Sequence, residues 1–224
     1  MNGSRQAFEN VRRQLQNAAR AAGRPVPALL AVSKTKPAAD VAALAACGQR
    51  AFGENYVQEG RDKARELAGL GLEWHLIGHL QSNKCREAAG SFDWVQSLDR
   101  ERLVEPLHRY RGDSRSPLNV LIQVNVDGEA SKSGCAPEQA EALARAVASA
   151  SHLRLRGVMG IGAPYPDFER RRASFQRLHG IFAELQAGFP GIDTLSMGMS
   201  EDFELAIAEG ATMVRIGSRL FGPR

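Results

Sequence analysis

The sequence alternates short apolar runs with segments in which apolar residues recur every three or four positions, the spacing of an amphipathic helix. Several runs are continuously apolar, as in parallel strands that are buried on both faces. Since this alternation fills a chain of 224 residues, it predicts an α/β fold, a single closed (β/α)8 TIM barrel. The eight expected strands are residues 28–33, 50–53, 74–78, 94–97, 119–126, 153–160, 194–197 and 213–216.

An extra helix is predicted before the first strand. Ser4 is its candidate N-cap, Gly23 ends it, and its apolar stripe consists of Phe8, Val11, Leu15, Ala18 and Ala22. Ser200 is the candidate N-cap of a much later helix. The helices expected between or after strands are residues 37–47, 137–150, 168–185 and 201–208.

The chain is predicted to form one domain. No linker rich in Pro, Gly or Ser divides it, so the domain spans residues 1–224. A doubly wound open sheet is the alternative fold. That fold usually carries a G-x-G-x-x-G turn after its first strand, whereas SKTKP (residues 33–37) follows the first strand here. The closed barrel is therefore favoured.

Composition excludes several classes of protein. No run approaches the roughly 20 apolar residues that span a bilayer, and the polar N-terminus is not a secretory signal. The three cysteines form no C-x-x-C pair, which argues against disulfides and structural zinc and indicates a reducing cytoplasm. Nor does any H-E-x-x-H pattern accompany His75 and His79, so no metal site is expected.

The chain has a modest excess of positive charge. The formal net charge is +4 and the pI about 9.2. These charges are scattered, and the densest run, residues 170–172, is interpreted as a solvated surface. We therefore expect a small anionic ligand rather than nucleic acid.

Lys34 is the most informative residue, because it directly follows the apolar first strand. Partial desolvation would lower the pKa of its amine, and a neutral amine attacks an aldehyde to form a Schiff base. The alternative is a lysine that reaches from a strand end into solvent. Lys36 lies two residues on and faces the same side if the strand continues. In a barrel, these strand ends form the face that carries the chemistry.

The last strand of the barrel is followed by a candidate anion-binding turn. Gly217 and Ser218 precede a short segment that forms about one helical turn, and Ser200 follows the neighbouring strand. Arg215 lies within the last strand. Either it pairs with a carboxylate such as Glu201, Asp202 or Glu209, or it presents a permanent cation to a ligand.

Seven motifs, in order along nearly the whole chain, resemble the pyridoxal phosphate homeostasis proteins, the YggS/PROSC family. They are AVSKTKP (31–37), FGENYVQE (52–59), EWHLIGHLQSNK (73–84), LIQVNV followed by SKSG (121–134), LRGVMGI (155–161), LSMGMSED (195–202) and MVRIGSRLFG (213–222). Two small departures from the family pattern, in residues 159–164 and at Met197, remove no ionisable group.

The resemblance implies a barrel like the N-terminal domain of alanine racemase and a cofactor, pyridoxal 5′-phosphate (PLP), held on Lys34 as a Schiff base. It also implies roles for other residues: Ser200, Gly217 and Ser218 at the phosphate, Arg215 facing the pyridine nitrogen, Asn55 lining the pocket, and Lys36 and Lys132 in PLP exchange.

The resemblance further implies a PLP carrier without catalytic turnover that supplies PLP to apo-enzymes. An arginine facing the pyridine nitrogen disfavours its protonation and weakens the cofactor as an electron sink. We expect a monomer or weak homodimer with no second domain and no membrane partner. A racemase-like PLP enzyme is the first alternative. A lysine aldolase for a sugar phosphate is the second, and RNA binding comes last.

Overall fold

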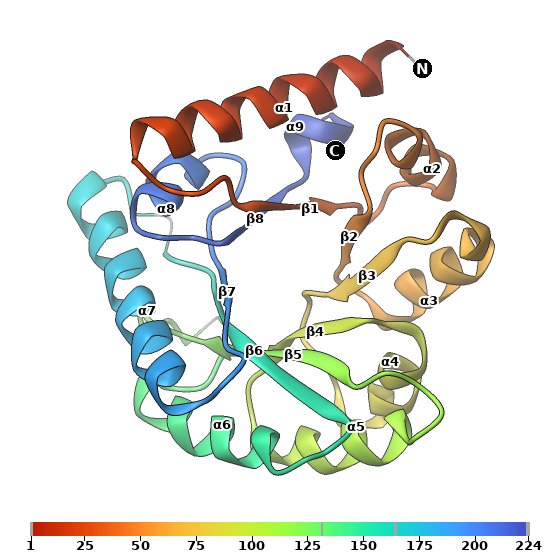
Figure 1. Cartoon of the computed structure of the whole chain (residues 1–224), viewed down its shortest axis with the longest axis vertical. Coiled ribbons are helices and arrows are strands. Elements are labelled where there is room, and N and C mark those ends of the chain that lie inside the picture. The colour runs from red at the N-terminus through yellow and green to blue at the C-terminus, as the bar shows by residue number, and fades with distance from the viewer. Residues whose placement is uncertain (1, 131, 164, 223–224) are drawn as a thin grey trace.

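A computed structural model describes residues 2–130, 132–163 and 165–222. Eight parallel strands form a closed barrel in sequence order, and β1 pairs with β8 to complete it (Figure 1). All eight predicted strands are confirmed, with ends displaced by no more than two residues. The strands are β1 (Ala28–Val32), β2 (Ala51–Glu54), β3 (Glu73–Leu76), β4 (Trp94–Leu98), β5 (Leu118–Val124), β6 (Leu153–Gly160), β7 (Thr194–Ser196) and β8 (Met213–Ile216).

Helices surround the barrel on its outer side (Figure 1). The described α-helices are α1 (Asn2–Ala21), α2 (Ala38–Ala46), α3 (Val57–Glu66), α4 (Cys85–Ser91), α5 (Val104–Arg111), α6 (Ala140–Ala148), α7 (Phe168–Gly188), α8 (Phe203–Ala208) and α9 (Ser218–Phe221). The described residues also form four short 3-10 helices: η1 (Ala68–Leu70), η2 (Ser82–Lys84), η3 (Glu101–Leu103) and η4 (Pro137–Gln139).

Two predicted helix caps are wrong. Helix α1 begins before Ser4, so Ser4 lies inside the first turn. Helix α8 begins only at Phe203 and has Asp202 at its N-cap, which frees Ser200 from that role. The carboxylate of Asp202 accepts a hydrogen bond from the backbone N–H of Met199 at 2.7 Å, so the chain turns before the helix starts.

Helix α1 is the predicted extra element, and it lies across α8 and α9 (Figure 1). Its inward stripe is Phe8, Val11, Leu15 and Ala19, all nearly inaccessible to solvent. Burial of this stripe stabilises the helix at a place where β1 and β8 close the barrel.

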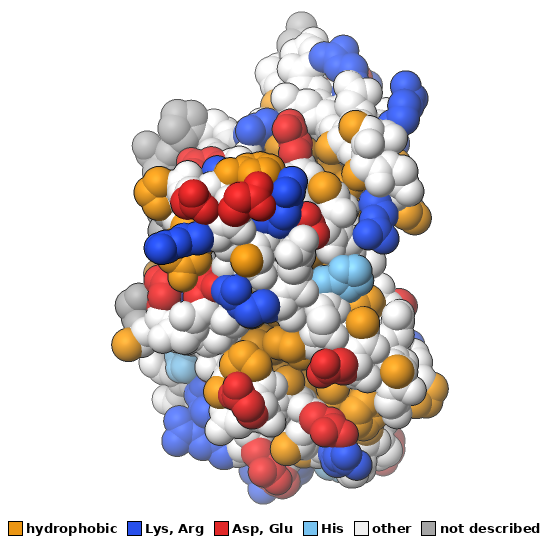
Figure 2. Space-filling model, turned by 90° about the vertical axis from the view of Figure 1, so that its left-hand side faces the viewer, with side chains coloured by type: hydrophobic (Ala, Val, Ile, Leu, Met, Phe, Trp, Pro, Cys, Tyr) orange, Lys and Arg blue, Asp and Glu red, His pale blue; other side chains and the backbone are white. Residues whose placement is uncertain are grey.

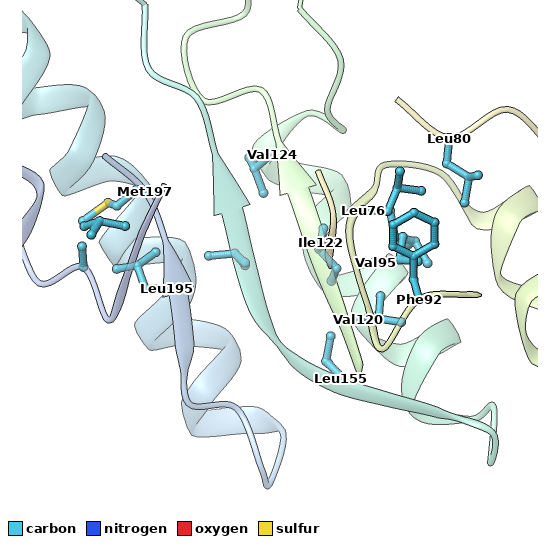
Figure 3. Close-up of a cluster of buried hydrophobic side chains, with 14 of the residues drawn as sticks. Leu76, Leu80, Phe92, Val95, Val120, Ile122, Val124, Leu155, Leu195 and Met197 are labelled. Carbon is cyan, nitrogen blue, oxygen red and sulfur yellow. The ribbon is translucent and has the colours of Figure 1, made fainter. Parts of the chain in front are cut away.

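The main hydrophobic core lies between the outer face of the barrel and the helices. Figure 3 shows part of it, with side chains from β3 to β7 and from the α4 region packed together: Leu76, Leu80, Phe92, Val95, Val120, Ile122, Val124, Leu155, Leu195 and Met197. A second cluster, made of Trp94, Leu121 and Met159, fills part of the barrel interior. Because strand side chains alternate, strand residues next to these outward-facing ones, such as Gln96, Leu121 and Ser196, point inward.

The described surface carries mixed charges. On the face shown in Figure 2, basic and acidic side chains are interspersed rather than gathered in one patch. No described helix is long and apolar enough to cross a membrane.

Candidate functional site

A cavity of about 560 Å³ opens where β1, β2, β6, β7 and β8 end. Its walls combine four cationic side chains, two carboxylates, hydroxyls, an amide and apolar groups. The lining residues are Val32, Lys34, Lys36, Asn55, Ile77, Ile161, Gly162, Tyr165, Arg171, Met199, Ser200, Glu201, Asp202, Arg215, Gly217, Ser218 and Gly222. The carboxyl ends of the strands thus hold the cavity, as predicted for this type of barrel.

The structure brings together seven of the eight predicted site residues. Lys34, Lys36, Asn55, Ser200, Arg215, Gly217 and Ser218 all line the cavity. Lys132 is not part of the lining. Its ammonium donates a hydrogen bond to the backbone oxygen of Gly162 at 2.8 Å and pairs with Glu129 at 2.8 Å. Lys132 therefore supports a cavity residue from behind.

The turn that carries Lys34 and Lys36 is held in an unusual backbone conformation. Thr35, between the two lysines, has a φ of 63°, the left-handed region that side chains other than glycine seldom adopt. Its backbone N–H donates a hydrogen bond to Glu59 at 2.6 Å. On the far side of the turn, the ammonium of Lys36 donates to the backbone oxygen of Phe221 at 3.2 Å. Helix α3 and the end of the chain both constrain the turn.

A buried ion-pair network lies directly behind this turn. The ammonium of Lys63 donates to the backbone oxygen of Ser33 at 2.7 Å, to Glu54 at 2.8 Å and to Glu59 at 2.7 Å. The hydroxyl of Ser33 donates to the same oxygen of Glu54 at 2.5 Å. Burial raises the pKa of Glu54 above its usual value, although Lys63 and Ser33 oppose that shift. The network fixes the end of β1 to the barrel wall.

Arg215 forms no ion pair with any described carboxylate. One guanidinium nitrogen donates to the backbone oxygen and the hydroxyl of Ser196, both at 2.8 Å, and the other donates to the backbone oxygen of Gly160 at 2.8 Å. Burial lowers the pKa of Arg215 to about 10, while Asp202 acts in the opposite direction. Arg215 thus stays a cation at neutral pH, and the predicted alternative of a paired arginine is wrong.

The turn after β8 approaches β1 closely. A Cβ at Gly217 would lie 3.3 Å from the backbone oxygen of Val32, and Ser218 begins α9. Ser200 lies on the neighbouring loop and lines the same cavity. Two hydroxyls and a glycine turn thereby lie on the β7–β8 side of the cavity. Such groups suit a phosphate, because hydroxyls and exposed backbone N–H groups donate hydrogen bonds to it.

Several lining residues were not predicted from the sequence as site residues, and two of them carry polar side chains that face the cavity from one segment. Tyr165 and Arg171 belong to the segment between β6 and the first turns of α7. The prediction that residues 170–172 form a solvated surface is wrong for Arg171, whose Nε atom is buried with no described hydrogen-bond acceptor. Arg171 lies four and seven residues before Phe175 and Leu178, which are both buried, so it shares the inward face of α7. This spacing is the sequence signal that could have identified Arg171.

Asp127 holds this segment in place. Its carboxylate accepts hydrogen bonds from the backbone N–H of Ala163 at 2.7 Å, from the hydroxyl of Ser174 at 2.6 Å and from Arg177 at 2.5 Å. Burial alone would raise the pKa of Asp127, but these donors outweigh it and the pKa lies below its usual value. One buried carboxylate therefore joins the loop after β5 to the wall that carries Tyr165.

No group of three or more His, Cys, Asp or Glu residues suited to a metal ion occurs among the described residues. His75 lies inside the barrel and stacks on Trp94, with ring centroids 5.0 Å apart. His79 is half exposed, 3.6 Å from Asp99.

The fold and the site together define the class: a TIM barrel whose strand ends carry a lysine, hydroxyls and a glycine turn around one cavity. The family model described as "Alanine racemase, N-terminal domain" matches residues 7–224. Alanine racemase from Corynebacterium glutamicum shares the fold, with a TM-score of 0.67 at 20% identity over 97% of this chain and 61% of that one.

Closer relatives give the particular family. The pyridoxal phosphate homeostasis protein of Pseudomonas aeruginosa is 54% identical over 94% of this chain and 91% of its own, and that of Escherichia coli K12 is 49% identical over 100% and 98%. The structure of PipY from Synechococcus elongatus with PLP bound has a TM-score of 0.85 at 37% identity, covering 98% and 100% of the two chains. The chain belongs to the family of pyridoxal phosphate homeostasis proteins.

Proposed function

We propose that the protein binds PLP in this cavity, with Lys34 as the amine that holds it, and serves PLP homeostasis in the cell. One observation carries the proposal. Lys34 lines the same cavity as Arg215 and as the Gly217–Ser218 turn, although these residues stand at opposite ends of the sequence. PLP carries an aldehyde, a pyridine ring and a phosphate, so it needs all three of these groups at once.

The residues present fit this cofactor. The amine of Lys34 is suited to a Schiff base with the aldehyde. Ser200, Ser218 and the backbone of Gly217 supply hydrogen-bond donors to the phosphate. Asn55 lines the wall of the cavity beside them. When bound, PLP supplies a reactive aldehyde conjugated to a pyridine ring that withdraws electrons.

Arg215 supports the role of a carrier rather than an enzyme. Its guanidinium is a buried cation held by backbone oxygens and a hydroxyl, not by a carboxylate. A cation facing the pyridine nitrogen keeps that nitrogen unprotonated, which weakens the electron sink that most PLP chemistry requires. We infer a protein that keeps PLP sequestered and supplies it to apo-enzymes. Lys36 at the cavity wall and Lys132 behind it are the candidates for assisting the release of PLP.

The reducing, cytoplasmic setting of the protein stays a prediction.

The proposal is tested by the absorbance spectrum of the purified protein after addition of PLP, with and without borohydride. The wild type is expected to show a visible band that borohydride removes, with the label on Lys34 by peptide mass. Lys34→Ala is expected to lack the band. Lys84→Ala is the matched control, because Lys84 is a surface residue paired with Glu87 outside the cavity. A wild type that binds no PLP contradicts the proposal. Capture of a sugar phosphate by borohydride would instead favour the aldolase alternative.

One observation favours a racemase-like enzyme as the second candidate. Tyr165 lines the cavity together with Lys34, and a tyrosine and a lysine are a suitable acid–base pair. Such an enzyme would exchange the α-hydrogen of an amino acid with deuterium from solvent, and Tyr165→Phe would slow this exchange. Absence of exchange over a panel of amino acids contradicts this candidate and leaves the carrier.

A further inference from the structure

A chain of polar side chains crosses the barrel interior below the cavity. It starts at Glu73, the first residue of β3, and passes through His75, Gln96 of β4 and Ser196 of β7 to Arg215 of β8. We propose that His75, Gln96 and Ser196 are positioning residues for the guanidinium of Arg215. The proposal rests on the proposed function, in which that guanidinium faces PLP.

Each link of the chain has hydrogen-bond length. The distance is 2.8 Å from Arg215 Nη1 to Ser196 Oγ and 2.8 Å from Ser196 Oγ to Gln96 Oε1. It is 2.9 Å from Gln96 Nε2 to His75 Nδ1 and 2.8 Å from His75 Nε2 to Glu73 Oε1. The chain therefore runs without interruption from the cavity to the amino-terminal end of the barrel.

The donors and acceptors of this chain run in one direction. A guanidinium only donates, so Ser196 accepts from Arg215 and donates its own hydrogen to the Gln96 oxygen. The Gln96 amide nitrogen donates to Nδ1 of His75, which places the ring hydrogen on Nε2, facing the carboxylate of Glu73. In the opposite amide orientation the Gln96 oxygen would accept a hydrogen from Nδ1. Nε2 of a neutral imidazole would then turn its lone pair toward the carboxylate of Glu73. Every group thus supports the orientation of the next.

The links are buried far more deeply than ordinary polar side chains. His75, Gln96 and Ser196 have no exposed surface, and Arg215 is 4% exposed. In such surroundings each hydrogen bond is strong, and loss of one partner leaves its neighbour without compensation. The stacking of Trp94 on His75 further fixes the ring. Glu73, in contrast, is 47% exposed. The chain thereby connects a buried cation to a carboxylate in contact with water.

Stability alone does not account for this chain. The interior of such a barrel is usually filled by branched apolar residues, and replacing buried polar groups by apolar ones is often neutral or stabilising. The structure places Trp94, Leu121 and Met159 in that role in the same interior. The polar chain instead leads to Arg215, the member of the chain that lines the cavity. Its function is to set where the guanidinium points.

The first test compares two serines of the barrel strands. Ser196→Ala removes a link, while Ser97→Ala removes a buried hydroxyl on β4 that has no described partner. Ser196→Ala is expected to weaken PLP binding about tenfold, the loss of one hydrogen bond to a charged group, and to shift the absorption maximum. Ser97→Ala is expected to keep both values. Equal binding and equal spectra for Ser196→Ala and the wild type would overturn the proposal.

The second test starts at the remote end of the chain. Glu73→Ala removes the terminal acceptor, Glu73→Gln retains an oxygen that accepts from His75, and Glu105→Ala removes an exposed carboxylate elsewhere. A shift in the spectrum of bound PLP with Glu73→Ala, largely restored in Glu73→Gln and absent in Glu105→Ala, supports the chain. Three spectra identical to the wild type contradict it.

A measurement without ligand separates this proposal from the proposed function. In the PLP-free protein, ¹⁵N NMR of His75 is expected to show hydrogen on Nε2 and a bare Nδ1, and Gln96→Leu is expected to change the Nδ1 signal. Hydrogen on Nδ1 in the wild type overturns the chain, whatever the protein binds. A wild type that shows the expected His75 signals but binds no PLP contradicts the proposed function instead.

Discussion

The carboxylate of Glu59 accepts a hydrogen bond from the backbone N–H of Thr35 at 2.6 Å, across the interval between α3 and the end of β1. The same carboxylate pairs with Lys63. The left-handed backbone of Thr35, which costs of the order of 1 kcal/mol, is thus held by a charged acceptor that is itself held in place. Lys34 and Lys36 take their directions from this turn.

Glu59→Ala is expected to reduce the affinity for PLP by about tenfold, because the turn between the two lysines loses its charged acceptor. Titration of the absorbance band with PLP measures the effect. Glu66→Ala, an exposed carboxylate on the same helix, is the control. Equal affinities of Glu59→Ala and Glu66→Ala would show that the turn holds without Glu59.

Lys63→Met is expected to cost about 3 kcal/mol in the free energy of unfolding, because Glu54 is left buried without its cation. Denaturant titration of the PLP-free protein measures this cost. Adding Glu54→Gln is expected to recover part of the loss, since the double variant buries no unpaired charge. Lys84→Met, at the surface, is expected to cost less than about 0.5 kcal/mol. A similar small cost for Lys63→Met would contradict the ion-pair account.

Gly78→Ala is expected to displace Asn55 from the cavity wall, because the added Cβ would lie 2.0 Å from the backbone oxygen of Asn55. We expect loss of both stability and PLP affinity. Gly180→Ala is the matched control: this helical glycine has open space around it, and the change is expected to stabilise by about 0.5–1 kcal/mol. Unchanged PLP affinity in Gly78→Ala would show that the position of Asn55 is not critical.

Acid is expected to destabilise the wall that carries Tyr165 through protonation of Asp127. The pKa of this carboxyl is lower in the folded protein than its usual 3.8, so its contribution to stability is complete above that value. The contribution is lost as the pH falls from about 4 toward the lower, folded pKa. Asp127→Asn removes the titration. The free energy of unfolding should therefore fall less steeply with acid in Asp127→Asn, and identical slopes would exclude the effect.

Ser200→Ala is expected to weaken PLP binding while the free energy of unfolding stays within about 0.5 kcal/mol of the wild type. The reason is that Ser200 lines the cavity and is not the cap of α8. Parallel PLP titration and denaturant titration separate the two effects. A loss of stability without a loss of affinity would restore the capping role.

The barrel and the place of the cavity at its strand ends were predictable because they depend on local sequence. Continuous apolar runs mark parallel strands, and the alternation of strand side chains places Lys34 on the same side as Val32. The strand ends then bring together residues that are remote in sequence. Family resemblance added the roles of single residues, since spacing alone leaves open whether a lysine at a strand end is a ligand or a surface group.

Helix α3 was not predicted, and its buried face explains why. That face consists of Val57, Gly60 and Lys63. Lys63 forms ion pairs at a position where an apolar residue would have completed the helical pattern of apolar residues. Gly60 is required because a Cβ there would lie 2.4 Å from the ring of Phe92. A pattern based on apolar residues does not detect such a helix.

The chain of hydrogen-bonded polar side chains inside the barrel also could not be predicted from the sequence. Alternation places His75 inward and excludes it from the surface, but its link to Ser196 passes through Gln96, which lies 100 residues from Ser196 along the chain. Arg171 was missed for a related reason. A run of three arginines follows a glutamate, and only the packing of α7 distinguishes the one that faces the cavity.

The pairing of β1 with β8 affects how the protein folds while it is being synthesised. Lys34 follows β1, whereas Arg215 lies in β8 and Ser218 begins α9, so translation produces Lys34 long before these two residues that line the same cavity. A nascent chain that has not yet reached β8 contains Lys34 but lacks part of the cavity wall. A ligand of this cavity can therefore stabilise only the completed barrel. Its binding free energy is added to the finished fold and not to the intermediates of translation.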